Sequence, residues 1–508
     1  MPSPRIRRVV PRTLVAGVVA GSVLGLFPPA LGSDVPPTVV RRVAIEGETL
    51  LPPRSAATLG AGGAVSLGRA SWSPRRVVCA PIRFTTVGVV WRQDGGEEIP
   101  ARLAVGGPGR FGPIVEVAGE PAEGPDPGSA DDAGLEGTPP VWTGEARCVR
   151  LRLRLPEGNA VGSFRVVFVN ASGTATPPSF LDRAGEALAR AWGMATEPFA
   201  ISPAEAATTQ PAIISRSGWG AKEKLRRCGP DYAEDGVKMA YVHHTVNSNA
   251  YPASRSDDLI RGIYAYHVQG RHFCDIAYNF LVDRYGRTFE GRFGGIDQPV
   301  IGAHAMGFNT GSTGVAALGT FTSTKAPAKM LRAFKRLLAW RLDVAHVRPT
   351  GKAVMVSAGG SAQKFDKGQQ VVLPAISGHR HTGYTTCPGS FLFRKLAPIR
   401  RAAQARGLPK LWDPARSVEA ISLWQAQTVQ LTATLSEPMS WSVAIADGLG
   451  GAVREFTGSG TLVDVTWDGK GEDGVTPVAP GTYTATMRAQ TGGGGVAREA
   501  VLTVVVNP

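Results

Sequence analysis

The chain has 508 residues, 43% hydrophobic and 19% charged, so it is long enough for two to four domains and too apolar for a mostly disordered protein. Its 55 Lys and Arg against 41 Asp and Glu give a formal net charge of +14. Residues 213–406 hold 28 basic and 12 acidic residues (net +16), and the rest of the chain holds 27 and 29 (net −2). All eight His fall in the same segment, so we expect metal or acid–base chemistry there.

The first 32 residues have the pattern of a secretory signal peptide. Four arginines precede an apolar run at residues 14–27, and small residues suitable for cleavage follow. The run has 14 residues, whereas a membrane span needs about 20. We expect an exported, extracellular protein without an integral membrane span. An uncleaved N-terminal anchor is the alternative, and export by the Sec or the twin-arginine route stays open.

Residues 40–175 are expected to form a β-rich domain of unknown role. Apolar residues alternate in RRVVCAPIRF, CVRLRLRL and SFRVVFVN, and an acidic loop lies around residues 126–136. The alternation favours an antiparallel, β-sandwich-like fold. Residues 176–212 are rich in Thr, Pro and Ala around one short amphipathic helix candidate, and we interpret them as a linker.

From residue 213 to 407 the pattern changes to alternating strands and helices. VKMAYVHH and IAYNFLVD are typical of strands, KMLRAFKRLLAWRLDVA of a helix, and Gly407 stands where the last helix should end. This predicts an α/β domain with helices packed on the sheet. Residues 408–508 return to β-patterned runs with turn signals at about ten-residue spacing, which favours a second sandwich.

The five cysteines suggest two disulfides and one metal ligand. Cys79 and Cys148 lie in strand-like runs, and Cys228 and Cys274 flank a pair of histidines. In an exported protein we expect these four to pair, although sequence alone does not fix the connectivity, and Cys228 and Cys274 as extra metal ligands are the alternative. Cys387 is left over, and a metal ligand is the better interpretation of it.

A catalytic zinc site needs three protein ligands, and His nitrogen and Cys thiolate both suit the ion. The candidates are one histidine of His243–His244, together with His379 and Cys387. Neighbours on a strand point to opposite faces, so only one of the pair can enter the site, and spacing does not say which. His381 is a rival ligand.

Five ordered segments resemble the motifs of the peptidoglycan-recognition proteins and phage-lysozyme-type N-acetylmuramoyl-L-alanine amidases. They are SRSGWGA (215–221), VHHT (242–245), CDIAYNFLVDRYGRTFEGR (274–292), GAHAMGFNTGSTGVAALGTF (302–321) and GHRHTGYTTCPG (378–389). The resemblance implies a zinc-dependent hydrolase that cuts the lactyl amide between N-acetylmuramic acid and L-alanine, with peptidoglycan as partner. The resemblance also implies the zinc ligands His243, His379 and Cys387, the catalytic residues Tyr278 and Thr385, and the substrate-groove residues His304 and Asn309.

A phenol and a hydroxyl can both hydrogen-bond the oxyanion of such a reaction, in agreement with Tyr278 and Thr385. For His304 and Asn309, structural loop roles are the alternative. The family includes recognition proteins that bind peptidoglycan without cutting it, and these typically lack the Cys ligand. Because Cys387 and Tyr278 are present, we expect an enzyme, with a non-catalytic sensor or a wall-structural protein as rivals.

The expected fold class is thus multidomain: a central α/β zinc amidase domain between an N-terminal β-sandwich-like domain and a C-terminal β-sandwich. WDGKGEDGVTPVAPGTYTATMRA in the C-terminal part resembles the immunoglobulin-like domain of flagellar hook-capping proteins. The concentrated positive charge suggests attraction to anionic wall polymers, and the signal peptide and His/Cys set argue against nucleic acid. We expect a monomer.

Several further side chains have expected structural roles. His244 should face away from the site, and Glu290 should fix a turn or an ion pair in place of acting as a general base. The other histidines, His267, His272 and His346, are expected at the surface. Residues 349–374 are expected as an additional hairpin at the rim of the groove.

Overall fold

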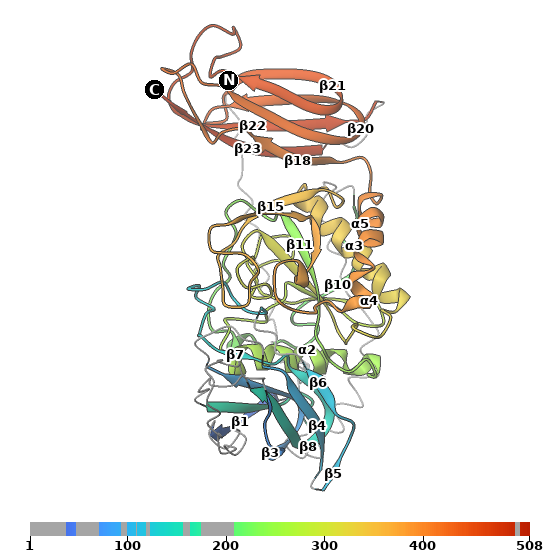
Figure 1. Ribbon diagram of the computed structural model, residues 1–508. Coiled ribbons are helices and arrows are strands. Elements are labelled where there is room, and N and C mark those ends of the chain that lie inside the picture. Colours follow the sequence, from blue (N-terminus) through green and yellow to red (C-terminus); the bar gives the residue numbers. More distant parts are fainter. Residues whose placement is uncertain are drawn as a thin grey trace, which may run out of the picture.

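The computed structural model describes residues 37–46, 71–92, 99–107, 109–117, 122–155, 163–173, 208–492 and 498–508. The predicted signal peptide and most of the predicted linker, including its helix candidate, lie outside these residues. The three larger β-sheets of the described residues follow one another along the long axis of the molecule, with helix α2 between the N-terminal and central ones (Figure 1). Within the described residues, no helix has the length and apolarity that a membrane crossing requires.

The N-terminal sheet has nine strands in the described residues, all paired antiparallel. Their order is β1-β9-β3-β8-β4-β5, with three short strands at the side. One face buries a core of its own, which includes Phe84, Trp91 and Phe168. The strands are β1 Val39–Glu46, β2 Ser71–Trp72, β3 Arg76–Trp91, β4 Ala101–Gly107, β5 Arg110–Phe111, β6 Val115–Val117, β7 Glu136–Gly137, β8 Val141–Leu155 and β9 Ser163–Asn170.

The expectation of an antiparallel β-rich domain agrees with this sheet, and its sandwich type stays a prediction. Cys79 and Cys148 lie opposite each other on β3 and β8 and form one of the two expected disulfides. Part of the other face of the sheet is also covered, because Val90, Val167 and Val169 pack against Tyr266 at the end of α2.

The central sheet has the order β10-β13-β12-β14-β11-β17. Neighbouring strands are parallel except β12 with β13. All six residues of β11 are buried, as expected for a parallel strand covered on both faces. The strands are β10 Ile213–Ile214, β11 Met239–His244, β12 Phe280–Val282, β13 Thr288–Glu290, β14 Ser312–Ala317 and β17 Ile376–Gly378.

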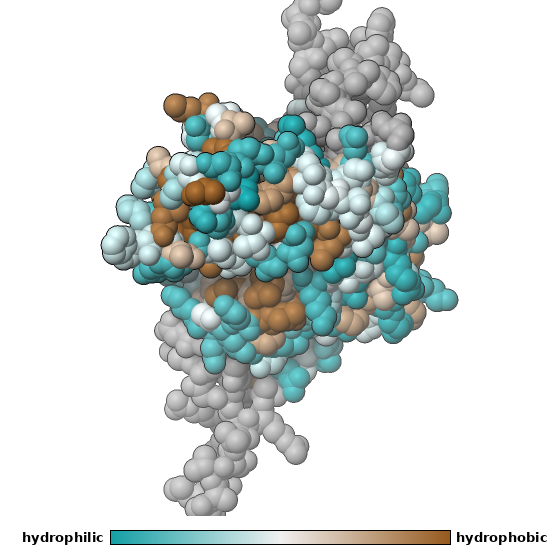
Figure 2. Space-filling model, turned by 90° about the horizontal axis from the view of Figure 1, so that it is seen from above, coloured by the Kyte–Doolittle hydropathy of each residue, from teal (hydrophilic) through white to brown (hydrophobic). Residues whose placement is uncertain are grey.

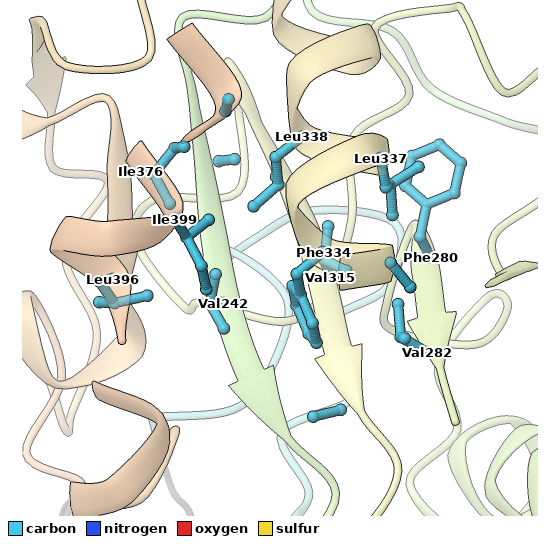
Figure 3. Packing of buried hydrophobic residues seen from close by; sticks show 14 of the residues in the cluster. Val242, Phe280, Val282, Val315, Phe334, Leu337, Leu338, Ile376, Leu396 and Ile399 are labelled. Atoms are coloured by element: carbon cyan, nitrogen blue, oxygen red, sulfur yellow. The ribbon is translucent and has the colours of Figure 1, made fainter. Parts of the chain in front are cut away.

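Helices cover both faces of this sheet, which confirms the α/β prediction. In α3, apolar residues recur every three or four positions, so Phe334, Leu337 and Leu338 point together onto the strands (Figure 3). Helix α2 closes the opposite face. The helices are α2 Ser256–Ala265, α3 Ala328–Val344, α4 Ser390–Phe393 and α5 Leu396–Gln404, with short 3-10 turns at Glu223–Leu225, Ala253–Arg255 and His379–His381 and a π turn at Tyr266–Gly270.

Strands β15 (Lys352–Val356) and β16 (Gln370–Pro374) pair antiparallel, so the expected extra hairpin is present. Its buried residues pack on Met239 and Tyr241 of β11. The hairpin loop and residues 125–136 together line a cavity of about 420 Å³.

The C-terminal sheet has the order β18-β20-β22-β23-β19, with β21 paired to β20. Trp467 and Tyr483 stack edge to face in its core. Viewed from above, apolar side chains lie in small separate groups among hydrophilic ones (Figure 2). The immunoglobulin-like type stays a prediction. The strands are β18 Leu411–Arg416, β19 Ala420–Ser422, β20 Val429–Ala446, β21 Ala452–Trp467, β22 Gly481–Gln490 and β23 Arg498–Asn507.

Candidate metal centre

Three candidate ligands meet at one edge of the central sheet. His243 lies near the end of β11, His379 directly follows β17, and Cys387 lies in the loop after that. Because β11 and β17 are parallel neighbours, their carboxyl ends bring residues 136 positions apart to the same place. One ligand atom from each of His243, His379 and Cys387 lies within 4.8 Å of the other two, and all three side chains are buried.

The hydrogen bonds of His379 leave one nitrogen for a metal ion. Nε2 lies 3.1 Å from the carbonyl oxygen of Ala122. A carbonyl only accepts, so Nε2 carries the proton and Nδ1 holds the lone pair. Nδ1 is buried and has no hydrogen-bond partner among the described residues, which is unfavourable unless another group binds it. A metal ion bound to Nδ1 would remove the free-energy cost of burying this nitrogen without a partner.

His243 is oriented from behind by a second histidine. Its Nε2 lies 3.1 Å from Nδ1 of His304, and its Nδ1 lies 3.6 Å from Sγ of Cys387. An outer partner of this kind fixes the ring of a metal ligand. Burial lowers the pKa of His243 well below the ordinary value and that of His379 to about 4. Both rings are therefore neutral at neutral pH, as metal binding requires.

The donor set fits zinc. Two neutral imidazoles and one cysteine sulfur form a set found at catalytic zinc sites, which keep the fourth position open. His381 is not part of it, because its Nδ1 accepts a hydrogen bond from Gly378 N and its ring packs on Phe393. His244 faces away, as expected, and accepts from Phe321 N.

Tyr278 and Thr385 lie beside the ligands. The Tyr278 ring is 5.6 Å from the His243 ring, and its hydroxyl donates to Oε1 of Glu123 at 2.8 Å. Thr385 Oγ1 accepts a 3.0 Å hydrogen bond from Cys387 N and so fixes the ligand loop. Neither side chain is remote from the site.

His304 and Asn309 are both fully buried. The Asn309 side-chain oxygen accepts from the backbone N–H groups of His304 and Ala305 at 2.8 and 2.9 Å. Asn309 thereby holds the loop that carries His304, and His304 holds His243. These contacts favour the structural alternative for both residues over a direct groove contact in this conformation.

The prediction that His267 lies at the surface is wrong. Its ring is buried, Nδ1 accepts from Ala277 N at 3.1 Å, and Nε2 lies 3.4 Å from Oε1 of Glu123. The reason is that the N-terminal part of the chain covers this end of α2. His272 and His346 are half-buried. Glu290 accepts from Arg216 N, in agreement with its expected structural role.

Ala122 and Glu123 were not found by sequence reasoning. They lie between β6 and β7 of the N-terminal sheet, more than 100 residues before the first ligand. Burial opposes ionisation of Glu123, but hydrogen bonds and charge from His267, with Tyr278 and Arg271, hold its pKa below the ordinary value. The acidic loop was the only signal, and nothing in its pattern says what it contacts.

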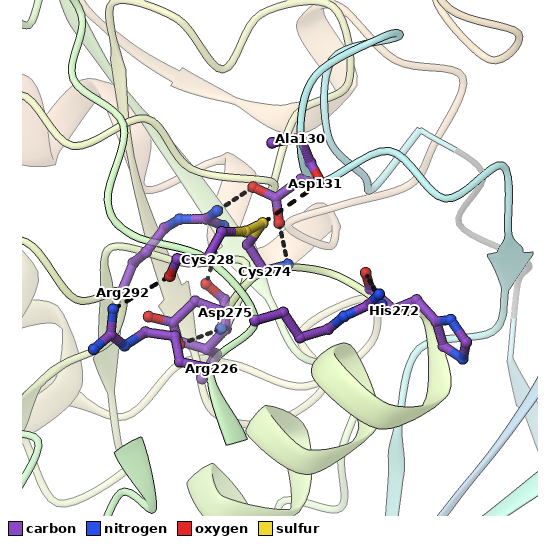
Figure 4. The surroundings of a disulfide bond; sticks show 10 residues. Ala130, Asp131, Arg226, Cys228, His272, Cys274, Asp275 and Arg292 are labelled. Atoms are coloured by element: carbon purple, nitrogen blue, oxygen red, sulfur yellow. Dashed lines mark hydrogen bonds and ion pairs between the residues drawn. A yellow bond between two sulfur atoms is a disulfide. The ribbon is translucent and has the colours of Figure 1, made fainter. Parts of the chain in front are cut away.

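The second expected disulfide, Cys228–Cys274, is also present (Figure 4). Cys387 is the cysteine outside the two disulfides. This division agrees with the expected use of the five cysteines.

The region around the candidate metal centre is similar to known proteins. A family model described as N-acetylmuramoyl-L-alanine amidase matches residues 233–390. Peptidoglycan-recognition protein SC2 of Drosophila melanogaster is 27% identical over 184 residues, covering 36% of this chain and 84% of that protein. Peptidoglycan-recognition protein 1 of Holotrichia diomphalia is 30% identical over 150 residues, covering 29% and 73%. Among solved structures, wild-type Drosophila PGRP-LB is 26% identical, covering 37% of this chain and 92% of that chain, with a TM-score of 0.29.

Proposed function

Because the chain belongs to the family of the peptidoglycan-recognition proteins and N-acetylmuramoyl-L-alanine amidases, we propose that it is a zinc-dependent amidase. It hydrolyses the amide between N-acetylmuramic acid and the L-alanine of the stem peptide. The observation that carries this proposal is the buried group of His243, His379 and Cys387, with an unsatisfied Nδ1 on His379. A protein that only binds peptidoglycan has no need of such a group.

His243, His379 and Cys387 would hold the zinc ion. When bound, zinc polarises the amide carbonyl and lowers the pKa of its water towards about 7. Around it, His304 keeps the His243 imidazole in the correct orientation, and in the conformation described here the Ala122 carbonyl accepts from His379 Nε2.

Tyr278 is the candidate for transition-state stabilisation. Its ring lies 5.6 Å from that of His243, and its hydroxyl has one proton to donate. Donation to the carbonyl oxygen of the substrate stabilises the negative charge that develops there. Thr385 lies in the same loop as Cys387 and accepts the hydrogen bond of its backbone N–H. Thr385 itself is half-buried.

We also propose that the protein acts outside the cell on the wall. Support comes from the signal-peptide pattern of residues 1–32 and from the net charge of +16 on residues 213–406. Stem-peptide carboxylates and wall phosphates are anionic, so this charge attracts the protein to its substrate.

Two measurements on the purified full chain test the proposal. We expect one zinc ion per chain by elemental analysis and release of free L-alanine amino groups from a defined muropeptide. Cys387→Ser should lose both while keeping the circular dichroism of the wild type. Full zinc content in Cys387→Ser would show that another ligand set operates. If neither the wild type nor the Glu123→Ala/Asp126→Ala variant bound zinc or hydrolysed the muropeptide, the protein would be a non-catalytic wall-binding protein.

A further inference from the structure

Residues 122–136, here called the acidic segment, connect β6 and β7 of the N-terminal sheet but lie against the central domain. They contain five carboxylates and no basic residue. Residues 122–125 are buried. The segment thus brings a concentrated negative charge to the domain that holds the net positive charge of the chain.

The first two residues contact the candidate metal centre directly. The carbonyl oxygen of Ala122 accepts from His379 Nε2 at 3.1 Å and from Met306 N at 3.0 Å. Its methyl carbon packs so closely on Gly383 that a Cβ there would lie 2.6 Å away. Oε1 of Glu123 accepts a 2.8 Å hydrogen bond from the Tyr278 hydroxyl, the donor that the proposed mechanism assigns to the substrate carbonyl.

The following residues use the donors of the neighbouring loops. Asp126 Oδ1 accepts from Asn309 Nδ2 at 2.7 Å, and the carbonyl oxygen of Gly124 accepts from the same amide at 3.0 Å. Asp131 pairs with Arg292 and accepts from Cys274 N beside the disulfide (Figure 4). Glu123, Asp126 and Asp131 therefore each bind donors of the central domain.

The side chains of the candidate site are buried in this arrangement. His243, His379, Cys387, Tyr278, His304 and Asn309 are each at most 1% exposed. A muropeptide must reach Tyr278 and the ligand group with its amide, and its stem peptide carries carboxylates of its own. The acidic segment is rich in turns, and it places its own carboxylates on Tyr278 and Asn309.

We propose that the acidic segment occupies the peptidoglycan-binding groove as a built-in competitor, so that the protein is latent until the segment is withdrawn. This inference rests on the proposed function for the identity of the displaced ligand. The opposite assignment, in which the segment is a fixed part of the working site, is disfavoured because Glu123 uses the only proton that Tyr278 can donate.

The test uses the full chain with Glu123→Ala and Asp126→Ala combined. Asp132→Ala is the matched control, because it removes a carboxylate that accepts hydrogen bonds from the N–H groups of Gly128 and Gly134 within the same segment. Circular dichroism verifies the fold of both variants. Two readouts, neither of which needs catalysis, are measured on protein freed of metal by chelation.

The first readout is alkylation of Cys387 by iodoacetamide, which reports this thiol because the other four cysteines are in disulfides. The second is the Kd for a MurNAc-tetrapeptide by titration calorimetry. If the acidic segment limits access to Cys387 and to the groove, Cys387 of the double variant should be alkylated about tenfold faster. The double variant should also bind the MurNAc-tetrapeptide about tenfold more tightly, since apparent affinity scales with the fraction of open molecules. Asp132→Ala should match the wild type in both.

Alkylation and binding equal to, or weaker than, the wild type in the double variant would overturn latency and make the segment a fixed part of the site. Faster alkylation and tighter binding in the double variant, without zinc uptake or hydrolysis in any variant, would support the proposal that the segment covers the groove. The same result would refute the amidase proposal. The two failures are therefore distinguishable.

Discussion

Gly314 in β14 gives the sharpest test of how the metal ligands are held. It lies against the imidazole of His304, and a Cβ added there would be 2.3 Å from Cδ2 and 2.4 Å from Cγ of that ring. Carbon atoms normally approach to about 3.5–4.0 Å. In Gly314→Ala the ring must therefore move by more than about 1 Å, and because His304 is fully buried it has no empty space to move into.

Two effects add in this variant. Overpacking a core costs about 1–3 kcal/mol of unfolding free energy. Displacement of His304 also breaks its 3.1 Å contact with His243 Nε2, and loss of an outer partner of a metal ligand costs about 10–100-fold in metal affinity. We expect zinc binding to weaken by that factor, in addition to the lower stability.

Zinc affinity is measured by chelator competition, and stability by urea unfolding of the metal-free protein. Gly229→Ala is the control, since nothing lies within 4 Å of a Cβ at that position. The control should keep wild-type zinc affinity. Wild-type zinc affinity in Gly314→Ala, with stability lowered as expected, would refute the role of His304 as the partner that positions His243.

Three further predictions concern catalysis, pH and charge. In the Glu123→Ala/Asp126→Ala background, Tyr278→Phe should keep zinc and lower kcat by about 10²–10³, and an unchanged kcat would remove Tyr278 from the mechanism. Burial lowers the pKa of His379 from 6.5 to about 4, so between these pH values the unfolded chain binds more protons than the folded one. The unfolding free energy of the metal-free protein should therefore fall by roughly 3 kcal/mol as pH falls from 6.5 to 4. Urea midpoints at several pH values check this, and a flat profile would contradict the buried, neutral ring. Binding to purified walls, measured by co-sedimentation, should weaken as ionic strength rises, and salt-independent binding would argue against charge attraction.

The central fold and its candidate ligands were accessible from the sequence because their signals are local. Residues 239–242, directly before His243, are apolar and buried, as in a strand covered on both faces, and the helical spacing around Phe334 marks one face for the sheet. The joining of His379 and Cys387 with His243 needed the family motifs, since spacing alone does not bring distant segments together. The ligand geometry agrees with that expectation.

The relation between the domains was not accessible in the same way. His267 lies in a π turn after a helix with ordinary amphipathic spacing, and periodicity does not reveal that a second sheet covers this end of the helix. Glu123 and Asp126 lie 155 and 183 residues from the partners they bind, Tyr278 and Asn309, in a loop without a repeating pattern. Such contacts depend on how two folded parts dock, which is a property of their surfaces and not of local sequence.

That docking couples the N-terminal sheet to the candidate site through two consecutive residues. Tyr266 donates to the carbonyl oxygens of Val89 and Thr138 on the sheet, and the next residue, His267, contacts Glu123 of the acidic segment. Thr138 itself stands two residues after the end of that segment. Because the same turn holds both the sheet and the segment, a movement that separates the sheet from α2 also pulls on the residues that cover Tyr278. Under the proposed latency, the N-terminal sheet would be the part of the molecule that controls access to the groove.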